Sequence, residues 1–206
     1  MYSLILALVL GLLPGTVTAE SIVVLGDSIS AGYGIDAGLG WVDLLQKKFN
    51  QQQNGYVISN ESISGDTTAG GLARIDQALK RHKPAIVLLE LGANDGLRGL
   101  SPQAMKSNLI EMIKRCQQTG AQVLLLGMKI PPNYGKRYVD MFYEIYPQLA
   151  NELNLPLVPF ILEEVVLKPE LMQADGLHPN AMAQPLIAEK IASYLEPLLR
   201  DAGKQR

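Results

Sequence analysis

The sequence is poor in cysteine, aromatic residues and histidine. Cys116 is the only cysteine among 206 residues, so no internal disulfide can form, and its place on the apolar stripe of residues 105–116 indicates a core residue. Aromatic side chains make up 6% of the chain and include one Trp, which gives no stacking platform for nucleic-acid bases or sugars. Two histidines are too few for a His/Cys metal cluster. We therefore expect no metal and no other cofactor.

The charge is nearly balanced, and the sequence contains no basic run. Eighteen Lys and Arg residues face twenty Asp and Glu residues, for a formal net charge of −2 and a pI near 5.7. This balance gives no electrostatic case for a nucleic-acid partner. Hydrophobic residues make up 48% of the chain, which is enough to bury one sizeable core.

The N-terminus has the pattern of a secretory signal. Residues 4–13 are apolar apart from Gly11, Pro14-Gly15 interrupts the run, and Val17-Thr18-Ala19 supplies the small residues of a cleavage site before Glu20. The run is short for a bilayer span, although the region before it has no Lys or Arg and an uncleaved anchor is the alternative. We expect residues 1–19 to be a cleaved signal peptide and residues 20–206 to be a single domain that is periplasmic or secreted and not stably inserted in a membrane.

The rest of the chain alternates short apolar runs with amphipathic stretches. Strands are expected over residues 22–25, 56–59, 85–91, 123–126 and 157–158. Helical stripes lie between them, with Asp66 or Thr67 as one N-cap, Ser101-Pro102 opening another helix, and Pro185 in the first turn of the last. The pattern predicts an α/β fold: a three-layer α/β/α sandwich around a five-stranded parallel sheet.

Four polar loops containing glycine should meet at the carboxyl edge of this sheet. They hold Gly26-Asp27-Ser28, residues 60–67 with Gly65, residues 92–96 with Asn94, and residues 175–180. Open α/β sheets place their ligands at this edge. Each loop by itself is consistent with ordinary turn chemistry, and Ser28 alone reads equally well as a turn serine.

The histidines narrow the chemistry by elimination. His82 lies in the charged turn Lys80-Arg81-His82-Lys83 on the opposite edge, where we expect a solvated surface residue. His178 follows Asp175 by three residues, a spacing that lets the carboxylate bind one imidazole nitrogen and leaves the other free to take a proton from Ser28. Asp-x-x-His alone is a weak signal, but with Ser28 on an adjacent loop it indicates nucleophilic catalysis.

Taken together, these segments resemble the SGNH (GDSL-like) hydrolase superfamily. The four blocks are residues 26–30, Gly65, residues 92–95 and residues 175–179, in the family's order and across nearly the whole chain after residue 19. Longer stretches, such as residues 25–33 and 90–99, resemble its branch of bacterial periplasmic thioesterases and lysophospholipases. Departures are small: Ile29 stands where the family motif has Leu, and Ala93 where Gly is frequent. The resemblance implies a flavodoxin-like sheet and a serine hydrolase.

The same resemblance implies a role for each residue. Ser28 would be the nucleophile, His178 the base and Asp175 its partner, with the oxyanion held by the Ser28 N–H, the Gly65 N–H and the Asn94 amide. The substrate would be a small acyl ester or thioester, including lysophospholipids, handled by a monomer. The two further aspartates of these blocks, at positions 27 and 95, are expected to fix loop geometry.

Leu97 and Leu100 are candidates for contacts with an acyl chain. They lie in the segment Gly96–Leu100, whose two glycines suggest a mobile loop, and two core contacts are the equal alternative on sequence alone. The implied activity on acyl chains favours the substrate-binding reading.

Two other classes of protein fit the sequence less well than this hydrolase. An α/β-hydrolase would need glycine where Ser30 stands. A dinucleotide-binding module would use Gly32-Tyr33-Gly34 with Glu61 on the ribose, but its glycines begin six positions after Gly26, too late for the strand end, and it leaves Asn94 and His178 unexplained.

Overall fold

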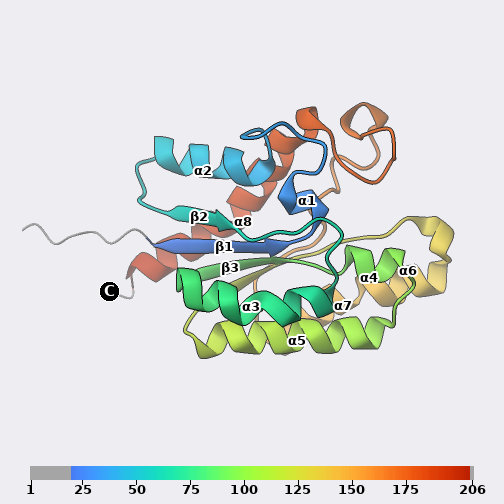
Figure 1. Ribbon diagram of the computed structural model, residues 1–206, viewed down its shortest axis with the longest axis horizontal. Helices are drawn as coiled ribbons and strands as arrows, with labels where there is room; N and C mark the ends of the chain where they lie inside the picture. Colours follow the sequence, from blue (N-terminus) through green and yellow to red (C-terminus); the bar gives the residue numbers. More distant parts are fainter. Residues whose placement is uncertain (1–19, 205–206) are drawn as a thin grey trace, which may run out of the picture.

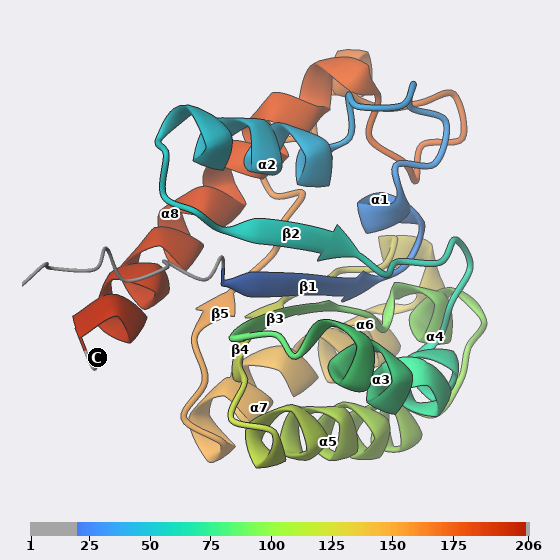
Figure 2. The same cartoon turned by 60° about the vertical axis from the view of Figure 1, so that its left-hand side comes forward.

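The computed structural model describes residues 20–204, with side chains to residue 200, and its core is a five-stranded sheet. The sheet order is β2-β1-β3-β4-β5 and all neighbouring strands run parallel (Figure 1; all five strands are labelled in Figure 2). The strands are β1 (Ser21–Gly26), β2 (Val57–Asn60), β3 (Ile86–Glu90), β4 (Gln122–Leu126) and β5 (Leu157–Val158). The expected parallel sheet is confirmed. The expected signal peptide, residues 1–19, lies outside the described residues.

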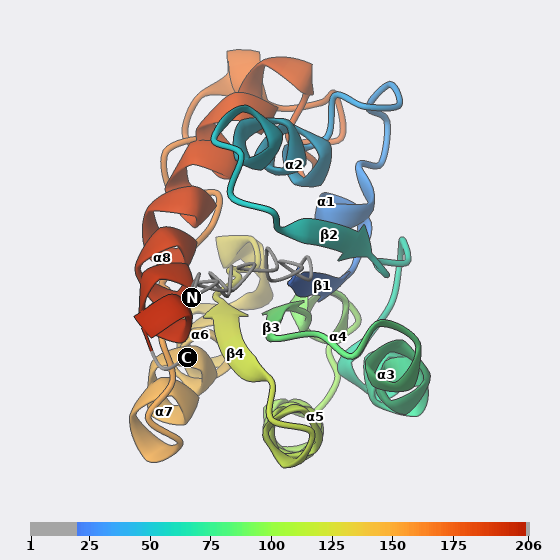
Figure 3. The ribbon, with the colours of Figure 1, turned by 90° about the vertical axis from the view of Figure 1, so that its left-hand side faces the viewer.

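Helices cover both faces of the sheet, as a three-layer sandwich requires. Figure 3 shows α2 and α8 on one face and α3, α5 and α7 on the other. Their bounds are α2 (Trp41–Gln51), α3 (Thr68–His82), α5 (Pro102–Gln118), α7 (Ile145–Glu152) and α8 (Gln184–Lys204). Shorter helices are α1 (Ser28–Ala31), α4 (Ala93–Leu97), α6 (Lys136–Tyr143), η1 (Pro132–Tyr134), η2 (Pro169–Leu171) and η3 (Ala181–Ala183).

The local signals in the sequence account for these elements. All five residues of β3 are buried, as expected of a strand covered on both faces. The hydroxyl of Thr67 accepts a hydrogen bond from the N–H of Gly70 and caps α3, and Ser101 caps α5 through the N–H of Ala104. Pro185 lies in the first turn of α8, where its missing N–H costs nothing.

Cys116 is fully buried, and burial raises the pKa of its thiol to about 12.

The strand order places a topological switch between β1 and β3. From β1 the chain crosses outward to β2 and later returns to β3 on the other side of β1, the arrangement beside which open α/β sheets bind their ligands, at the carboxyl ends of the strands. Figures 1 and 2 show α1 and α4 just beyond the arrowheads at this end. Gly26, the last residue of β1, pairs with Glu90, the last residue of β3. Within residues 20–204, no helix is both long and apolar enough to cross a membrane.

Candidate active site

Ser28 lies at a sharp turn from β1 into α1. The Asp27 side chain caps α1 by accepting the Ile29 N–H at 3.0 Å, and Ser28 is the first helical residue. A Cβ at Gly26 would lie 2.6 Å from Glu90 Oε2 and 2.7 Å from Ser30 Oγ, so only glycine fits at this position. The turn therefore holds Ser28 at the carboxyl edge of the sheet, where the residue is half-buried.

Ser28, His178 and Asp175 form a continuous chain of contacts. His178 Nε2 is 2.8 Å from Ser28 Oγ, and His178 Nδ1 is 2.7 Å from Asp175 Oδ2. Asp175 Oδ1 also accepts the backbone N–H groups of Leu177 at 2.9 Å and His178 at 3.0 Å. These bonds lower the pKa of Asp175 to about 2; the bond from the His178 N–H has the largest effect and the bond with the His178 ring the next largest. The carboxylate is thus charged and aimed at the imidazole.

The loop that carries His178 is tied down by a residue that sequence reasoning missed. The amide of Gln173 donates to the carbonyl oxygens of Tyr33 at 2.8 Å and Pro179 at 3.0 Å, and its backbone N–H donates to the His178 carbonyl at 2.8 Å. The Tyr33 ring lies against the imidazole, with 4.6 Å between the ring centroids. No spacing in the sequence joins Gln173 to Tyr33, 140 residues away, so only the folded chain shows this contact.

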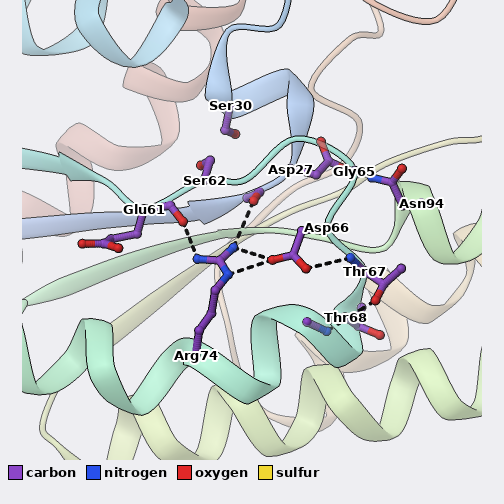
Figure 4. A network of polar contacts seen from close by, with 12 residues as sticks. Asp27, Ser30, Glu61, Ser62, Gly65, Asp66, Thr67, Thr68, Arg74 and Asn94 are labelled. Atoms are coloured by element: carbon purple, nitrogen blue, oxygen red, sulfur yellow. Dashed lines mark hydrogen bonds and ion pairs between the residues drawn. The ribbon is translucent and has the colours of Figure 1, made fainter.

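Gly65 lies in the loop between β2 and α3, whereas Asn94, expected in a loop, lies in the first turn of α4; both lie near Asp27 (Figure 4). Gly65 has φ = +80°, a left-handed conformation that suits glycine, and its carbonyl accepts from Arg98 Nη2 at 2.7 Å. Asn94 Nδ2 donates to Asp27 Oδ2 at 3.0 Å, which fixes the plane of the amide and leaves its second N–H available.

Three buried carboxyl groups support the segments that carry Ser28, Gly65 and Asn94. Asp95, as expected of a residue that fixes loop geometry, accepts the backbone N–H of Thr68 at 2.8 Å and its hydroxyl at 2.6 Å. Glu90 Oε2 accepts the Asp27 N–H at 3.2 Å and the Ser30 hydroxyl at 2.7 Å. Burial raises the pKa of Asp27 to about 6, and burial together with the nearby Asp27 raises the pKa of Glu90 well above its ordinary value.

The segment with Leu97 and Leu100 differs from the expected free loop. Gly96 and Leu97 belong to α4, and Gly96 is buried so closely that a Cβ would lie 2.6 Å from Ile130. Glycine at 96 therefore serves close packing and not mobility. Leu97 is half-buried against the core, whereas 43% of Leu100 is exposed. The hydroxyl of Tyr134 donates to the carbonyl oxygen of Leu97, and the hydroxyl of Tyr138 donates to that of Leu100, both at 2.8 Å.

The side chains of His82 and Glu61 contact each other. The sequence predicted a solvated surface side chain for His82, and this prediction is wrong. His82 lies half-buried in the last turn of α3, with Nε2 2.5 Å from Glu61 Oε1. Arg81 also donates to that oxygen, at 3.0 Å. The dinucleotide alternative assigned Glu61 to a ribose, but its carboxylate serves these two side chains. Among the side chains that the structure describes, up to residue 200, no group of three His, Cys, Asp or Glu is arranged to hold a metal.

Known proteins are similar to this chain in both sequence and fold. The GDSL-like Lipase/Acylhydrolase family profile matches residues 24–184. The "Arylesterase" of Vibrio mimicus is 51% identical over 86% of this chain and 88% of its own. The "Thioesterase 1/protease 1/lysophospholipase L1" of Escherichia coli K12 is 47% identical over 88% of this chain and 86% of its own. The crystal structure of the psychrotrophic esterase EstA from Pseudoalteromonas sp., inhibited by monoethylphosphonate, superposes with a TM-score of 0.84 at 42% identity, covering 88% of this chain and 99% of EstA.

Proposed function

The chain belongs to the GDSL-like lipase/acylhydrolase family and is an ester hydrolase, and we propose that it cleaves acyl esters and thioesters through Ser28, His178 and Asp175. The observation that carries the proposal is the pair of contacts at 2.8 and 2.7 Å that joins the three side chains. They have the geometry in which a serine nucleophile, its base and the orienting carboxylate act as a unit.

Each atom of the proposed reaction has a place in this arrangement. The Ser28 oxygen attacks the acyl carbon while His178 Nε2 takes the hydroxyl proton, and Asp175 stabilises the imidazolium that results. When the tetrahedral intermediate collapses, the bond to the alcohol or thiol breaks, and His178 returns its proton to that leaving group. Water then attacks the acyl-serine ester by the same steps, which releases the carboxylic acid and restores Ser28.

The negative charge on the former carbonyl oxygen requires donors that are already in place. We assign these to the Ser28 N–H, the Gly65 N–H and the free N–H of the Asn94 amide. The Gly65 assignment is supported by its lack of a Cβ, which would otherwise crowd the approach to its N–H, and by its place two residues before the N-cap of α3. Asp27 supports the Asn94 assignment because it holds the amide from the opposite side.

Leu97 and Leu100 are the proposed acyl-chain contacts. They follow Asn94 by three and six residues, and Leu100 is an exposed apolar residue. The relatives are named arylesterase and thioesterase/lysophospholipase, which supports small acyl esters and thioesters, lysophospholipids included, as the substrate class. We propose that the protein acts as a monomer in the periplasm or outside the cell, after cleavage before Glu20.

The Ser28→Ala variant tests the proposal directly. Purified native protein, Ser28→Ala and a surface control, Ser107→Ala on α5, are assayed with p-nitrophenyl butyrate and butyryl-CoA. A fluorophosphonate should add mass to the native protein and to Ser107→Ala but not to Ser28→Ala. Near-native hydrolysis by Ser28→Ala, on either substrate, would refute the assignment.

A further inference from the structure

The proposed oxyanion hole is assembled from two chain segments that must keep a fixed separation. Ser28 follows the end of β1, whereas Gly65 lies in the oxyanion loop, which we define as residues 61–67 between β2 and α3. Donors stabilise the transition state only when they are in place before charge develops, and small displacements are costly. A side chain that fixes the oxyanion loop relative to β1 should therefore affect the rate of hydrolysis.

The side chain of Arg74 lies at this junction (Figure 4). From the second turn of α3, its Nε donates to Asp66 Oδ2 at 2.7 Å, and its Nη1 donates to the carbonyl of Glu61. Its Nη2 reaches the Gly26 carbonyl at 3.3 Å. One guanidinium thus contacts the last residue of β1 and both ends of the oxyanion loop.

The Gly26 carbonyl is shared between Arg74 and the middle of the loop. It accepts the Ile63 N–H at 3.0 Å as well as the bond from Arg74, and the Ile63 carbonyl in turn accepts the Asp66 N–H at 3.1 Å. Gly26 lies only two residues before Ser28. The hydrogen bonds of the Gly26 carbonyl therefore position both Ser28, two residues later, and the segment that leads to Gly65.

The Arg74–Asp66 pair is shielded from solvent, and the helix below it makes room for it. The two side chains are 18% and 12% exposed, whereas in the Arg115–Asp76 pair they are 32% and 68% exposed. A Cβ at Gly70 would lie 1.8 Å from Asp66 Oδ1, so α3 tolerates only glycine there while Asp66 keeps its place. Helix propensity alone would favour alanine at this position.

We propose that Arg74 is a positioning residue that holds the Gly65 N–H at the correct distance from Ser28. This inference rests on the proposed oxyanion role of Gly65. A planar guanidinium can donate in three directions at once, and a lysine ammonium at the same position cannot match that geometry. Arg74→Lys should therefore keep the charge but loosen the oxyanion loop.

Kinetics on p-nitrophenyl butyrate and butyryl-CoA test this role. Because the donor is displaced and not removed, kcat of Arg74→Lys should fall by roughly tenfold to a hundredfold, less than the loss on deleting one oxyanion donor, with KM within about twofold. The inactivation rate with a fluorophosphonate should fall in parallel, since its phosphoryl oxygen needs the same donors. Arg115→Lys on α5, which loses a more exposed Arg–carboxylate pair, is the matched control and should keep native kcat.

Gly70→Ala separates positioning from general stability. The alanine should displace Asp66 from Arg74, so we expect kcat to fall by about fivefold or more while the melting temperature changes little, because α3 gains helix propensity. This variant also decides the matter if Arg74→Lys does not fold.

Three outcomes would overturn the role of Arg74: native kcat in folded Arg74→Lys or Gly70→Ala, a loss confined to KM, or an equal loss in Arg115→Lys. The Ser28→Ala protein distinguishes failure of the role of Arg74 from failure of the proposed mechanism. If Ser28→Ala is inactive while Arg74→Lys keeps native kcat, only the inference about Arg74 fails; if Ser28→Ala is active, the proposed mechanism fails.

Discussion

The two sides of Ser28 are built in opposite ways. On the acid–base side, Asp175 and His178 are three residues apart in one surface loop, and 39% of the Asp175 side chain is exposed. On the oxyanion side, Asp27 and Glu90 are 1% and 0% exposed and come from segments 63 residues apart.

This difference follows from the charge that each side needs. Asp175 must be ionised to stabilise an imidazolium, and hydrogen bonds from the His178 N–H, the His178 ring and the Leu177 N–H lower its pKa to about 2. The oxyanion side must offer N–H donors to a new negative charge, so a fixed carboxylate nearby would oppose it. Burial raises the pKa values of Asp27 and Glu90, which reduces that opposing charge while both side chains keep bracing the turn.

The largest expected effect comes from removing residues of the triad. Ser28→Ala and His178→Ala should each lower kcat by roughly 10⁴-fold or more, and the double variant should be no worse than either single one, because the residues act as a unit. Single-turnover assays on p-nitrophenyl butyrate measure this. Additive losses would show that His178 acts independently of Ser28.

On the oxyanion side we expect a smaller loss. Asn94→Ala should reduce kcat by about 10²- to 10³-fold with little change in KM, since one donor to the transition state is removed. Asn151→Ala, on the exposed side of α7, is the control. If the loss appears chiefly in KM, Asn94 binds the substrate in its ground state and does not belong to the oxyanion hole.

The same contrast explains what could be predicted from sequence. The five strands, the capping of α3 by Thr67 and the pairing of Asp175 with His178 depend on local patterns of periodicity and spacing. The bracing by Arg74 could not be foreseen, because it joins Gly26 to a residue 48 positions away and any of the chain's arginines could read as a surface charge.

Glycine shows how far a local reading can go wrong. Two glycines around Leu97 suggested mobility, yet Gly96 is a packing contact in α4 and Gly99, at φ = +67°, is a turn. Residue type alone does not distinguish these uses, since the difference lies in Ile130 and Phe142, which come from elsewhere in the chain and fill the space beside Gly96.

The rim of the site should control chain-length preference more modestly. Each methylene buried in an apolar groove is worth about 0.8 kcal/mol, or about fourfold in kcat/KM, before the groove is filled. Leu97→Ser should flatten this increase across a series from acetyl to palmitoyl thioesters and leave acetyl hydrolysis nearly native. An equal loss on all chain lengths would mean that Leu97 supports Asn94 through α4 and does not contact the acyl chain.

The smallest effect on catalysis is expected for Glu90→Gln, which tests the buried side of the comparison. Glu90 Oε1 has no hydrogen-bond partner among the residues that the structure describes, so an amide nitrogen can replace it while the remaining oxygen still accepts from Asp27 and Ser30. We expect kcat to fall by less than about tenfold, the equivalent of ~1.4 kcal/mol.

The informative readout is the free energy of unfolding against pH. Because the pKa of Glu90 is raised in the folded protein, its stabilising contribution is present below the ordinary value of 4.5 and is lost as pH rises. The amide introduced by Glu90→Gln does not titrate, so the stability of this variant relative to native should increase as the pH rises above 4.5, the ordinary pKa of the carboxyl group. Burial alone would raise the pKa of Glu61 too, but its bonds with His82 and Arg81 lower it, so Glu61→Gln should show the opposite slope as the pH passes the ordinary value of 4.5. Parallel pH profiles for native protein and Glu90→Gln would mean that Glu90 ionises as readily folded as unfolded, and the contrast between the two sides of Ser28 would then not depend on charge.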